Sequence, residues 1–180
     1  MEPGSDEYYM RMALAEAEKA AARDEVPVGA VVVAGAPGGA GPIIGSGSAG
    51  SNAGVMGAAG AGTSVIAGGI VIARAHNLTE TLNDPTAHAE MQAITAATSY
   101  LGGKYLTDCT LYVTVEPCVM CAGALAWSQV SAVVWGTDDP KKGYTTTGAS
   151  ILHPKTQVRR GVLAEECSAI MKKFFRKKRE

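Results

Sequence analysis

The chain of 180 residues contains little cysteine, few aromatic side chains and almost no net charge. Four cysteines are too few for a disulfide-stabilised scaffold of this length, so we expect free thiols and a reducing compartment, the cytoplasm. The first residues are acidic and polar, which argues against a secretory signal peptide. Dense runs of about 20 apolar residues are missing, which argues against a membrane span. With 47% hydrophobic residues, the sequence predicts one globular domain over residues 1–180.

The net charge of −1 conceals an uneven distribution of charged side chains. Residues 1–140 contain 5 basic and 14 acidic residues, whereas residues 141–180 contain 11 basic and 3 acidic ones. A basic C-terminal end is typical of proteins that bind a polyanion, nucleic acid above all. It is also typical of a solvated helix end, where cations interact favourably with the helix dipole. Both interpretations are open from charge alone.

The spacing of apolar residues predicts helices and strands that alternate along the chain. This alternation is typical of a sheet covered by helices, an α/β fold. The segment Asp84-Pro85-Thr86 predicts the start of a helix, with Thr86 as its cap. Helices are expected over residues 7–23, 86–98, 118–127 and 164–178, and strands over residues 28–33, 70–73, 110–115 and 132–135.

Residues 34–69 depart from this pattern, because 13 of these 36 residues are glycine, nine are alanine and none is charged. The larger apolar residues are too scattered for a membrane span, and a strict Gly-x-y period, as in collagen, is missing. We expect a flexible loop inserted between two strands that pair as a hairpin. Pro27 and Asn77 then lie at the opposite end of that hairpin, so we expect the insertion to be dispensable for catalysis.

Two short motifs carry side chains that bind metals, His-x-Glu at residues 88–90 and Cys-x-x-Cys at residues 118–121. Cysteines three apart in the first turn of a helix place both sulfur atoms on one face, and the helix N-terminus favours the thiolate form that zinc requires. A Cys-x-x-Cys motif alone also fits a redox pair, half of a structural zinc site or two buried thiols. Together with His88, however, Cys118 and Cys121 make three ligands, the number typical of a catalytic zinc site that keeps one position for water.

Glu90 is the candidate proton carrier of such a site, because zinc hydrolases need a carboxylate that moves protons. In the middle of a helix, residues two apart point roughly 200° away from each other. His88 and Glu90 therefore converge only if their helix meets the site end-on, with both residues near its N-terminus.

These motifs match the zinc nucleobase deaminase pattern H-x-E followed by P-C-x-x-C. More specifically, the chain resembles the bacterial tRNA adenosine deaminase family of the cytidine deaminase superfamily, over residues 7–33 and 70–179. The resemblance is carried by Glu25-Val26-Pro27-Val28-Gly29-Ala30, by Asp84-Pro85-Thr86-Ala87-His88-Ala89-Glu90, by residues 118–124 and by Phe174-Phe175-Arg176.

The resemblance implies a three-layer α/β/α cytidine-deaminase-like fold around a central five-stranded mixed sheet, and a homodimer. It implies one Zn²⁺ ion per chain, held by His88, Cys118 and Cys121. The implied reaction is the hydrolytic deamination of adenosine to inosine at the wobble position of a tRNA anticodon stem-loop. Glu90 would transfer protons between water and the adenine base.

The resemblance also implies residues that contact the substrate. Asn77 and Val28 match positions around the flipped base, although Asn77 also fits a turn residue and Val28 fits a strand core residue equally well. Asp139 matches a loop position near the nucleic-acid backbone, and the C-terminal Phe pair is open to a stacking or a packing role. The full set of expected substrate contacts is Asn77, Val28, Ala89, Asp139, Phe174, Phe175 and Arg176.

Two departures from the family pattern keep a second function open. Trp127 stands where tRNA enzymes often carry a smaller or polar residue, and an aromatic residue at this position is a feature that resembles guanine deaminases. Residues 144–154 also diverge from the family. The alternative is therefore a free-base or nucleoside deaminase of the guanine or cytosine type. A non-catalytic zinc protein is a third class, but a closed structural zinc site has no need of Glu90.

Overall fold

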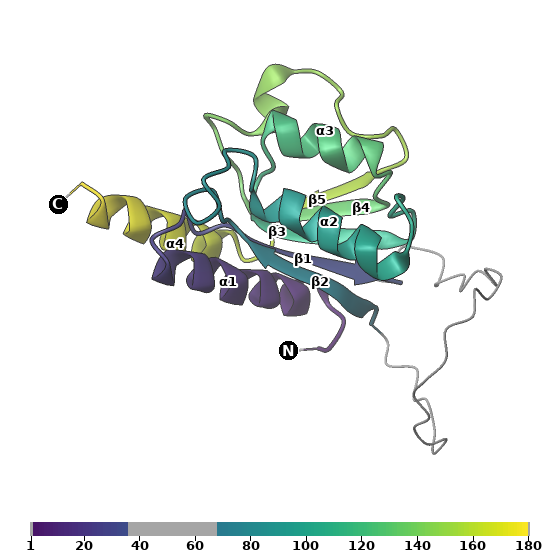
Figure 1. Ribbon diagram of the computed structural model, residues 1–180, viewed down its shortest axis with the longest axis horizontal. Helices are drawn as coiled ribbons and strands as arrows, with labels where there is room; N and C mark the ends of the chain where they lie inside the picture. Colours follow the sequence, from purple (N-terminus) through teal and green to yellow (C-terminus); the bar gives the residue numbers. More distant parts are fainter. Residues whose placement is uncertain (1, 36–67, 180) are drawn as a thin grey trace, which may run out of the picture.

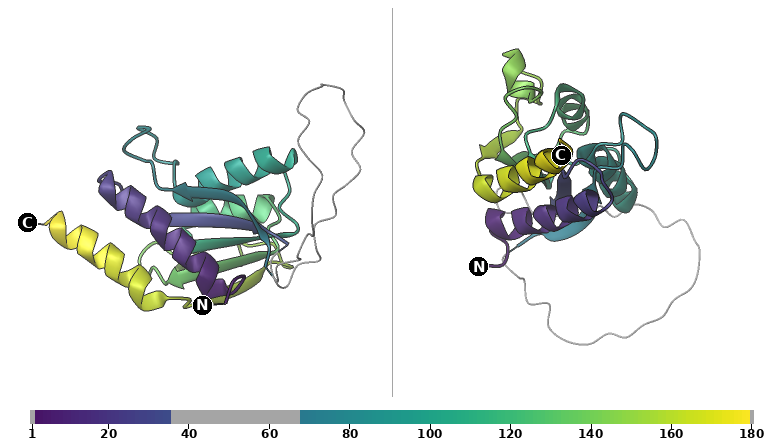
Figure 2. Two further views of the ribbon diagram at one scale, coloured as in Figure 1. Left: turned by 90° about the horizontal axis from the view of Figure 1, so that it is seen from below. Right: turned by 90° about the vertical axis from the view of Figure 1, so that its left-hand side faces the viewer.

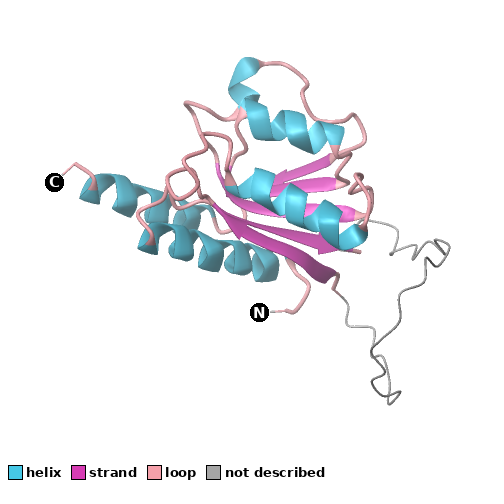
Figure 3. Cartoon of the chain, in the orientation of Figure 1, coloured by secondary structure: helices cyan, strands magenta, loops and turns pink. Residues whose placement is uncertain are grey.

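The computed structural model describes residues 2–35 and 68–179, which form a mixed β-sheet between two pairs of helices (Figures 1 and 3). The strand order is β2-β1-β3-β4-β5. The helices are α1 (Asp6–Ala22), α2 (Ala89–Leu101), α3 (Val119–Trp127), α4 (Ala164–Lys177) and the short 3-10 helix η1 (Tyr144–Thr147). The strands are β1 (Gly29–Ala34), β2 (Ile70–His76), β3 (Cys109–Val115), β4 (Ala132–Thr137) and β5 (Gln157–Arg160).

The sheet joins an antiparallel half to a parallel half. Strand β1 is antiparallel to both β2 and β3, whereas β3, β4 and β5 are parallel. Helices α1 and α4 cover one face of the sheet, and α2 and α3 cover the other (Figures 1 and 2). The three-layer α/β/α fold with a five-stranded mixed sheet is therefore confirmed. No helix within the described ranges combines the length and the apolar character that a bilayer crossing requires.

The alternating residues of β1 divide the core into two clusters. Val31 and Val33 pack with the α1 and α4 layer, and Ala30 and Val32 pack with the α2 and α3 layer. Helix α1 lies so close to β1 that a Cβ atom on Gly29 would be 2.0 Å from a backbone oxygen of α1. A glycine is therefore required where the chain enters the sheet beside the functional site.

One sequence expectation is wrong, and one strand is absent from the residue pattern. Helix α2 starts after His88, not at Thr86, because the Asp84 carboxylate accepts hydrogen bonds from both the backbone nitrogen and the hydroxyl of Thr86 and so closes a turn ahead of the helix. Strand β5 was not expected from the residue pattern, since this four-residue edge strand is mostly exposed and contains no apolar run.

The predicted hairpin is confirmed. Strands β1 and β2 pair from Gly29 opposite His76 to Ala34 opposite Ile70. Ala34 thus belongs to β1, and the inserted segment begins after it. Residues 36–67 lie outside the described residues, so the loop predicted there, and its dispensability, stay predictions. Asn77 directly follows β2 at the other end of the hairpin.

Candidate active site

The predicted site residues gather at one end of the sheet, beyond the carboxyl ends of the parallel strands β3 and β4. In α/β proteins this edge is the usual place for ligand binding. A cavity of about 940 Å³ opens there. Its lining comes from both helix layers and from the loops that follow β2, β3 and β4.

Three side chains at this edge form a potential metal centre. His88 is the N-cap residue of α2, Cys118 is the N-cap residue of α3, and Cys121 lies in the first turn of α3. The Nδ1 atom of His88 is 3.6 Å from the Cys118 sulfur and 3.5 Å from the Cys121 sulfur. Ligands at zinc–nitrogen and zinc–sulfur bond lengths in a tetrahedral site are about 3.6 Å apart, so this donor set fits zinc.

The protonation of the two thiols also suits a metal centre. A hydrogen bond from Cys121 lowers the pKa of Cys118 to about 4, against the opposing effect of burial, and His88 lowers it further. The same pairing with Cys118, together with burial, raises the pKa of Cys121. The hydrogen bond to Cys118 raises the pKa of His88, whereas burial lowers it. The site therefore holds one thiolate before any metal binds, and metal binding would release the second proton.

Glu90 is in the first turn of α2, two residues after His88, and lines the cavity. Its side chain is buried, with the residue only 4% exposed. Burial raises the pKa of Glu90 to about 7, although the neighbouring His88 acts in the opposite direction. A carboxyl group with such a pKa can both accept and donate a proton near neutral pH. The end-on approach of this helix, which the sequence required, is confirmed.

The residues expected around the base come from the open end of the β1–β2 hairpin and from the start of α2. Val28, Asn77 and Ala89 all line the cavity, although they come from three separate segments. The backbone nitrogen of Asn77 donates to the carbonyl of Val28 at 3.0 Å, which closes the hairpin at this end. The Asn77 carboxamide donates to the Glu25 carboxylate, a residue that sequence reasoning had not assigned to the site.

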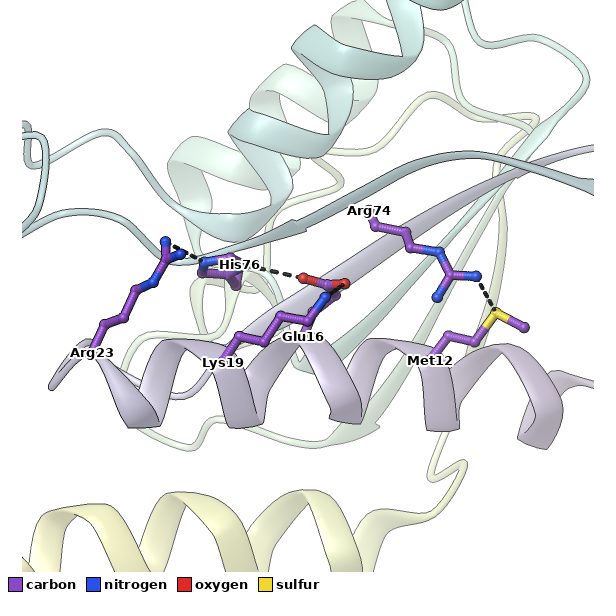
Figure 4. A network of polar contacts seen from close by, with 6 residues as sticks. All are labelled: Met12, Glu16, Lys19, Arg23, Arg74 and His76. Atoms are coloured by element: carbon purple, nitrogen blue, oxygen red, sulfur yellow. Dashed lines mark hydrogen bonds and ion pairs between the residues drawn. The ribbon is translucent and has the colours of Figure 1, made fainter.

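Figure 4 shows how the same end of β2 is attached to α1. The Nδ1 atom of His76 is 3.0 Å from one carboxylate oxygen of Glu16, and the other oxygen of Glu16 accepts a hydrogen bond from Lys19 at 2.7 Å. Arg23 lies 3.3 Å from Nε2 of His76. Because an arginine only donates, Nε2 accepts and Nδ1 carries the proton that is donated to Glu16. This network fixes the residue that immediately precedes Asn77.

Another buried glutamate organises the loop after β4. Glu116 accepts hydrogen bonds from the backbone of Asp139 at 3.0 Å and from the backbone and hydroxyl of Thr145 at 3.0 and 2.6 Å. A Cβ atom on Gly143 would be 2.3 Å from the Glu116 carboxyl carbon, so only glycine fits there. Asp139 itself lines the cavity, as expected. Its backbone is held by Glu116, which lies two residues before Cys118.

The basic helix α4 forms the outer wall of the cavity. Figure 2 shows its C-terminal half extending beyond the end of the sheet. Lys172, Phe175, Lys178 and Arg179 line the cavity. Phe174 does not: its ring packs edge-on against Phe175 and lies 5.5 Å from the Lys178 ammonium group. Of the expected contacts at the C-terminal end, Phe175 is at the cavity, whereas Phe174 and Arg176 are on α4 but not in its lining.

Trp127 lies away from this cavity. It is the last residue of α3 and is 85% exposed, whereas the cavity lies at the other end of that helix. The aromatic residue that kept a guanine-type substrate open is therefore not part of the lining.

Sequence reasoning missed Glu25, Glu116 and the cavity-facing charges of α4. Glu25 belongs to a stretch that carries the family resemblance, and Glu116 lies two residues before the Cys-x-x-Cys motif, but their importance depends on hydrogen bonds across 23 to 56 positions of sequence. The C-terminal segment contains a signal that could have been used, because Lys172, Phe175 and Arg179 are three and four residues apart and so share one face of a helix.

Comparison with known proteins agrees with this geometry. A family model described as MafB19-like deaminase matches residues 48–179. The tRNA-specific adenosine deaminase of Bacillus subtilis (strain 168) is 39% identical, in an alignment that covers 97% of this chain and 91% of that protein. A structure solved in a study of A-to-I editing by tRNA:A34 deaminases is 33% identical, with a TM-score of 0.68, and the match covers 91% of this chain and 98% of the other. The guanine deaminase of Bacillus subtilis is 29% identical, with a TM-score of 0.53, over 78% of this chain and 68% of the other.

Proposed function

The chain belongs to the tRNA-specific adenosine deaminase family, and we propose that it converts adenosine to inosine at the wobble position of a tRNA anticodon. The observation that carries this proposal is the composition of the cavity. Its inner side holds Glu90 and the His88–Cys118–Cys121 group, and its outer wall is the basic face of α4. Hydrolytic chemistry on a nucleobase requires the first, and a polyanionic substrate favours the second.

The metal in this proposal is one zinc ion per chain, held by His88, Cys118 and Cys121. The donor set supports this assignment, because one imidazole and two thiolates at tetrahedral spacing are typical of zinc and leave one position for water. When bound, zinc would lower the pKa of a water molecule so that it becomes a nucleophile near neutral pH.

Glu90 moves the protons of the reaction. It accepts one proton from the attacking water, whose oxygen bonds to C6, and passes this proton to the adenine ring nitrogen. It then takes the second proton from the hydroxyl group on C6 and delivers it to the departing amino group. The bond between C6 and the amino nitrogen breaks, a C6 carbonyl forms and ammonia leaves. A raised pKa suits this double role, because the same carboxyl group must take and give a proton within one turnover.

The remaining residues of the cavity bind and orient the substrate. Val28, Asn77 and Ala89 surround the base beside the metal centre. Lys172, Lys178 and Arg179 attract the phosphates of the anticodon stem-loop, and the half-exposed Phe175 offers a ring on which a neighbouring base can stack. Asp139 approaches the nucleic-acid backbone from the loop after β4.

A homodimer and a cytoplasmic location complete the proposal. The outer face of α3 carries Val119, Gly123 and Trp127 at intervals of four residues, and both large side chains are exposed. Such a stripe with a central glycine allows a second copy of the chain to approach closely. All four cysteines are free, which suits a reducing compartment.

The proposal is tested by a deamination assay of the purified, zinc-loaded protein. The substrates are an anticodon stem-loop with adenosine at the wobble position, and free guanine, adenosine and cytidine. We expect inosine in the stem-loop and no reaction of the small molecules. Turnover should fall steeply as salt is raised, because binding to phosphates releases counterions.

A guanine-type activity is the second candidate, because a guanine deaminase shares the fold at 29% identity. Ammonia from guanine alone, with little dependence on salt, would replace the first proposal. The exposed position of Trp127 argues against this outcome.

A further inference from the structure

The cavity is backed by a buried carboxylate that the mechanism above does not use. Glu25 lies in the loop between α1 and β1 and is 0% exposed. Within the described residues it forms no ion pair. A buried charge without a cation is costly unless hydrogen bonds replace the lost water. Four donors do so here, and they all come from residues 77–81.

These hydrogen bonds converge on both carboxylate oxygens of Glu25. One oxygen accepts from the Asn77 carboxamide at 3.0 Å, the Thr79 hydroxyl at 3.3 Å and the Glu80 backbone at 3.2 Å. The other accepts from the Thr81 backbone at 2.7 Å. Burial by itself raises the pKa of Glu25, but the hydrogen bonds from Thr81 and Glu80 outweigh burial and lower it. Glu25 is therefore an ionised group that only accepts hydrogen bonds.

This arrangement fixes the direction of the Asn77 carboxamide. Its nitrogen donates to Glu25 at 3.0 Å and to the Thr79 hydroxyl at 2.9 Å, which uses both of its N–H groups. The opposite orientation would place the carboxamide oxygen against an ionised carboxylate. The oxygen has no partner among the described residues, and no side-chain nitrogen or oxygen buried within them lacks one. The oxygen of Asn77 therefore reaches open space, and Asn77 lines the cavity.

Resting on the proposed function, we infer that Glu25 is a positioning residue which makes Asn77 a hydrogen-bond acceptor toward the substrate. Asn77 then recognises an N–H or O–H donor of the target nucleotide. A nucleotide with a lone pair at that place would be rejected, because two acceptors would face each other in a buried site.

Reciprocal substitutions test this inference. Glu25→Gln introduces a group that can donate, which allows the Asn77 carboxamide to turn over and present its nitrogen to the cavity. Asn77→Asp places two carboxylates against each other. In the double variant the introduced glutamine donates to the introduced aspartate, which again presents an acceptor to the cavity. Each single change should lower kcat/KM for the stem-loop roughly tenfold, and the double variant should recover most of that loss.

The control is Glu80→Gln, which removes an exposed carboxylate from the same turn and should change kcat/KM less than twofold. Zinc content and thermal unfolding are measured for every variant. If Glu25 merely supports the turn at residues 79–81, the double variant will be no better than the worse single variant, and the inference is wrong.

An NMR measurement gives a readout that does not depend on the substrate. In the wild-type protein the side-chain amide protons of Asn77 should exchange slowly with water, and in Glu25→Gln they should exchange faster. Rapid exchange in the wild type overturns the inference, even if Glu25→Gln does not fold. A wild-type protein that leaves the stem-loop unchanged overturns the proposed function instead, and the exchange result still decides whether Glu25 holds Asn77.

Discussion

The inner and outer sides of the cavity are built in opposite ways. The inner side is built from the N-termini of two helices, which carry His88, Glu90, Cys118 and Cys121. The ligand atoms of His88, Cys118 and Cys121 lie within 4.8 Å of one another. On the outer side, Lys172 on α4 and Lys178 and Arg179, which directly follow α4, are long, solvent-exposed side chains.

This difference separates chemistry from recognition. Proton transfer and metal binding require atoms placed within tenths of an ångström, which buried side chains at helix termini provide. Attraction of a phosphate backbone depends on the number and location of charges and tolerates mobile side chains. We therefore expect substitutions on the inner side to lower kcat, and substitutions on the outer side to raise KM.

The largest effect is expected from Glu90→Gln, which breaks the inner side without removing a metal ligand. The amide cannot carry protons, so kcat should fall roughly 10²- to 10⁴-fold. Zinc content should stay the same, because the three ligands are intact. Single-turnover formation of inosine and metal analysis of the same sample check both statements. Loss of zinc in this variant would make Glu90 a ligand or a structural support, and would contradict its assigned role.

The outer side is tested next by the triple variant Lys172→Ala, Lys178→Ala and Arg179→Ala. KM for the stem-loop should rise roughly ten- to a hundredfold and the salt dependence of log KM should weaken by about 2, at about 0.7 for each lost contact to single-stranded nucleic acid. The value of kcat should change little. Kinetics at several salt concentrations measure these effects.

A matched control separates position from total charge. Lys155→Ala, Lys173→Ala and Lys177→Ala remove the same number of positive charges from residues outside the cavity lining. This control should change KM much less. Equal effects of the two triple variants would show that only net charge matters and that α4 has no specific contact with the substrate.

The sequence predicted the parts of the site that depend on local motifs and missed the parts that depend on distant contacts. The candidate metal ligands and Glu90 are carried by motifs of three to five residues, so local spacing and helix geometry were sufficient to expect them at one site. Glu25 and Glu116 act through contacts with residues 23 to 56 positions away, which no local pattern contains. Strand β5 was missed for a related reason. It is a strand because it pairs with β4, and it has no apolar run of its own that a sequence pattern could show.

Glu25, which lies behind the cavity, also contributes to the stability of the fold. Its pKa predicts how the free energy of unfolding depends on pH. Its folded-state pKa lies below the ordinary value of 4.5. The stability that the ionised group contributes is therefore present above pH 4.5 and is lost as the pH falls through the folded-state pKa. Glu25→Gln should lower the free energy of unfolding by about 1–3 kcal/mol at neutral pH, and the difference from wild type should shrink in acid. Urea unfolding between pH 3 and pH 7 measures it, and a difference that grew in acid would contradict the lowered pKa.

The smallest effect is expected from Trp127→Ala, which sharpens the comparison by testing a residue on neither side of the cavity. Because the side chain is 85% exposed at the far end of α3, its loss should change kcat/KM for the stem-loop less than about twofold and leave guanine unreactive. The same change should weaken the proposed homodimer, since it removes the largest exposed side chain of the α3 stripe. Kinetics are therefore measured at a protein concentration at which light scattering shows the same oligomer mass for the variant and the wild type. A new activity toward guanine would show that Trp127 influences substrate choice from outside the cavity, and substrate choice would then depend on more than the residues that line it.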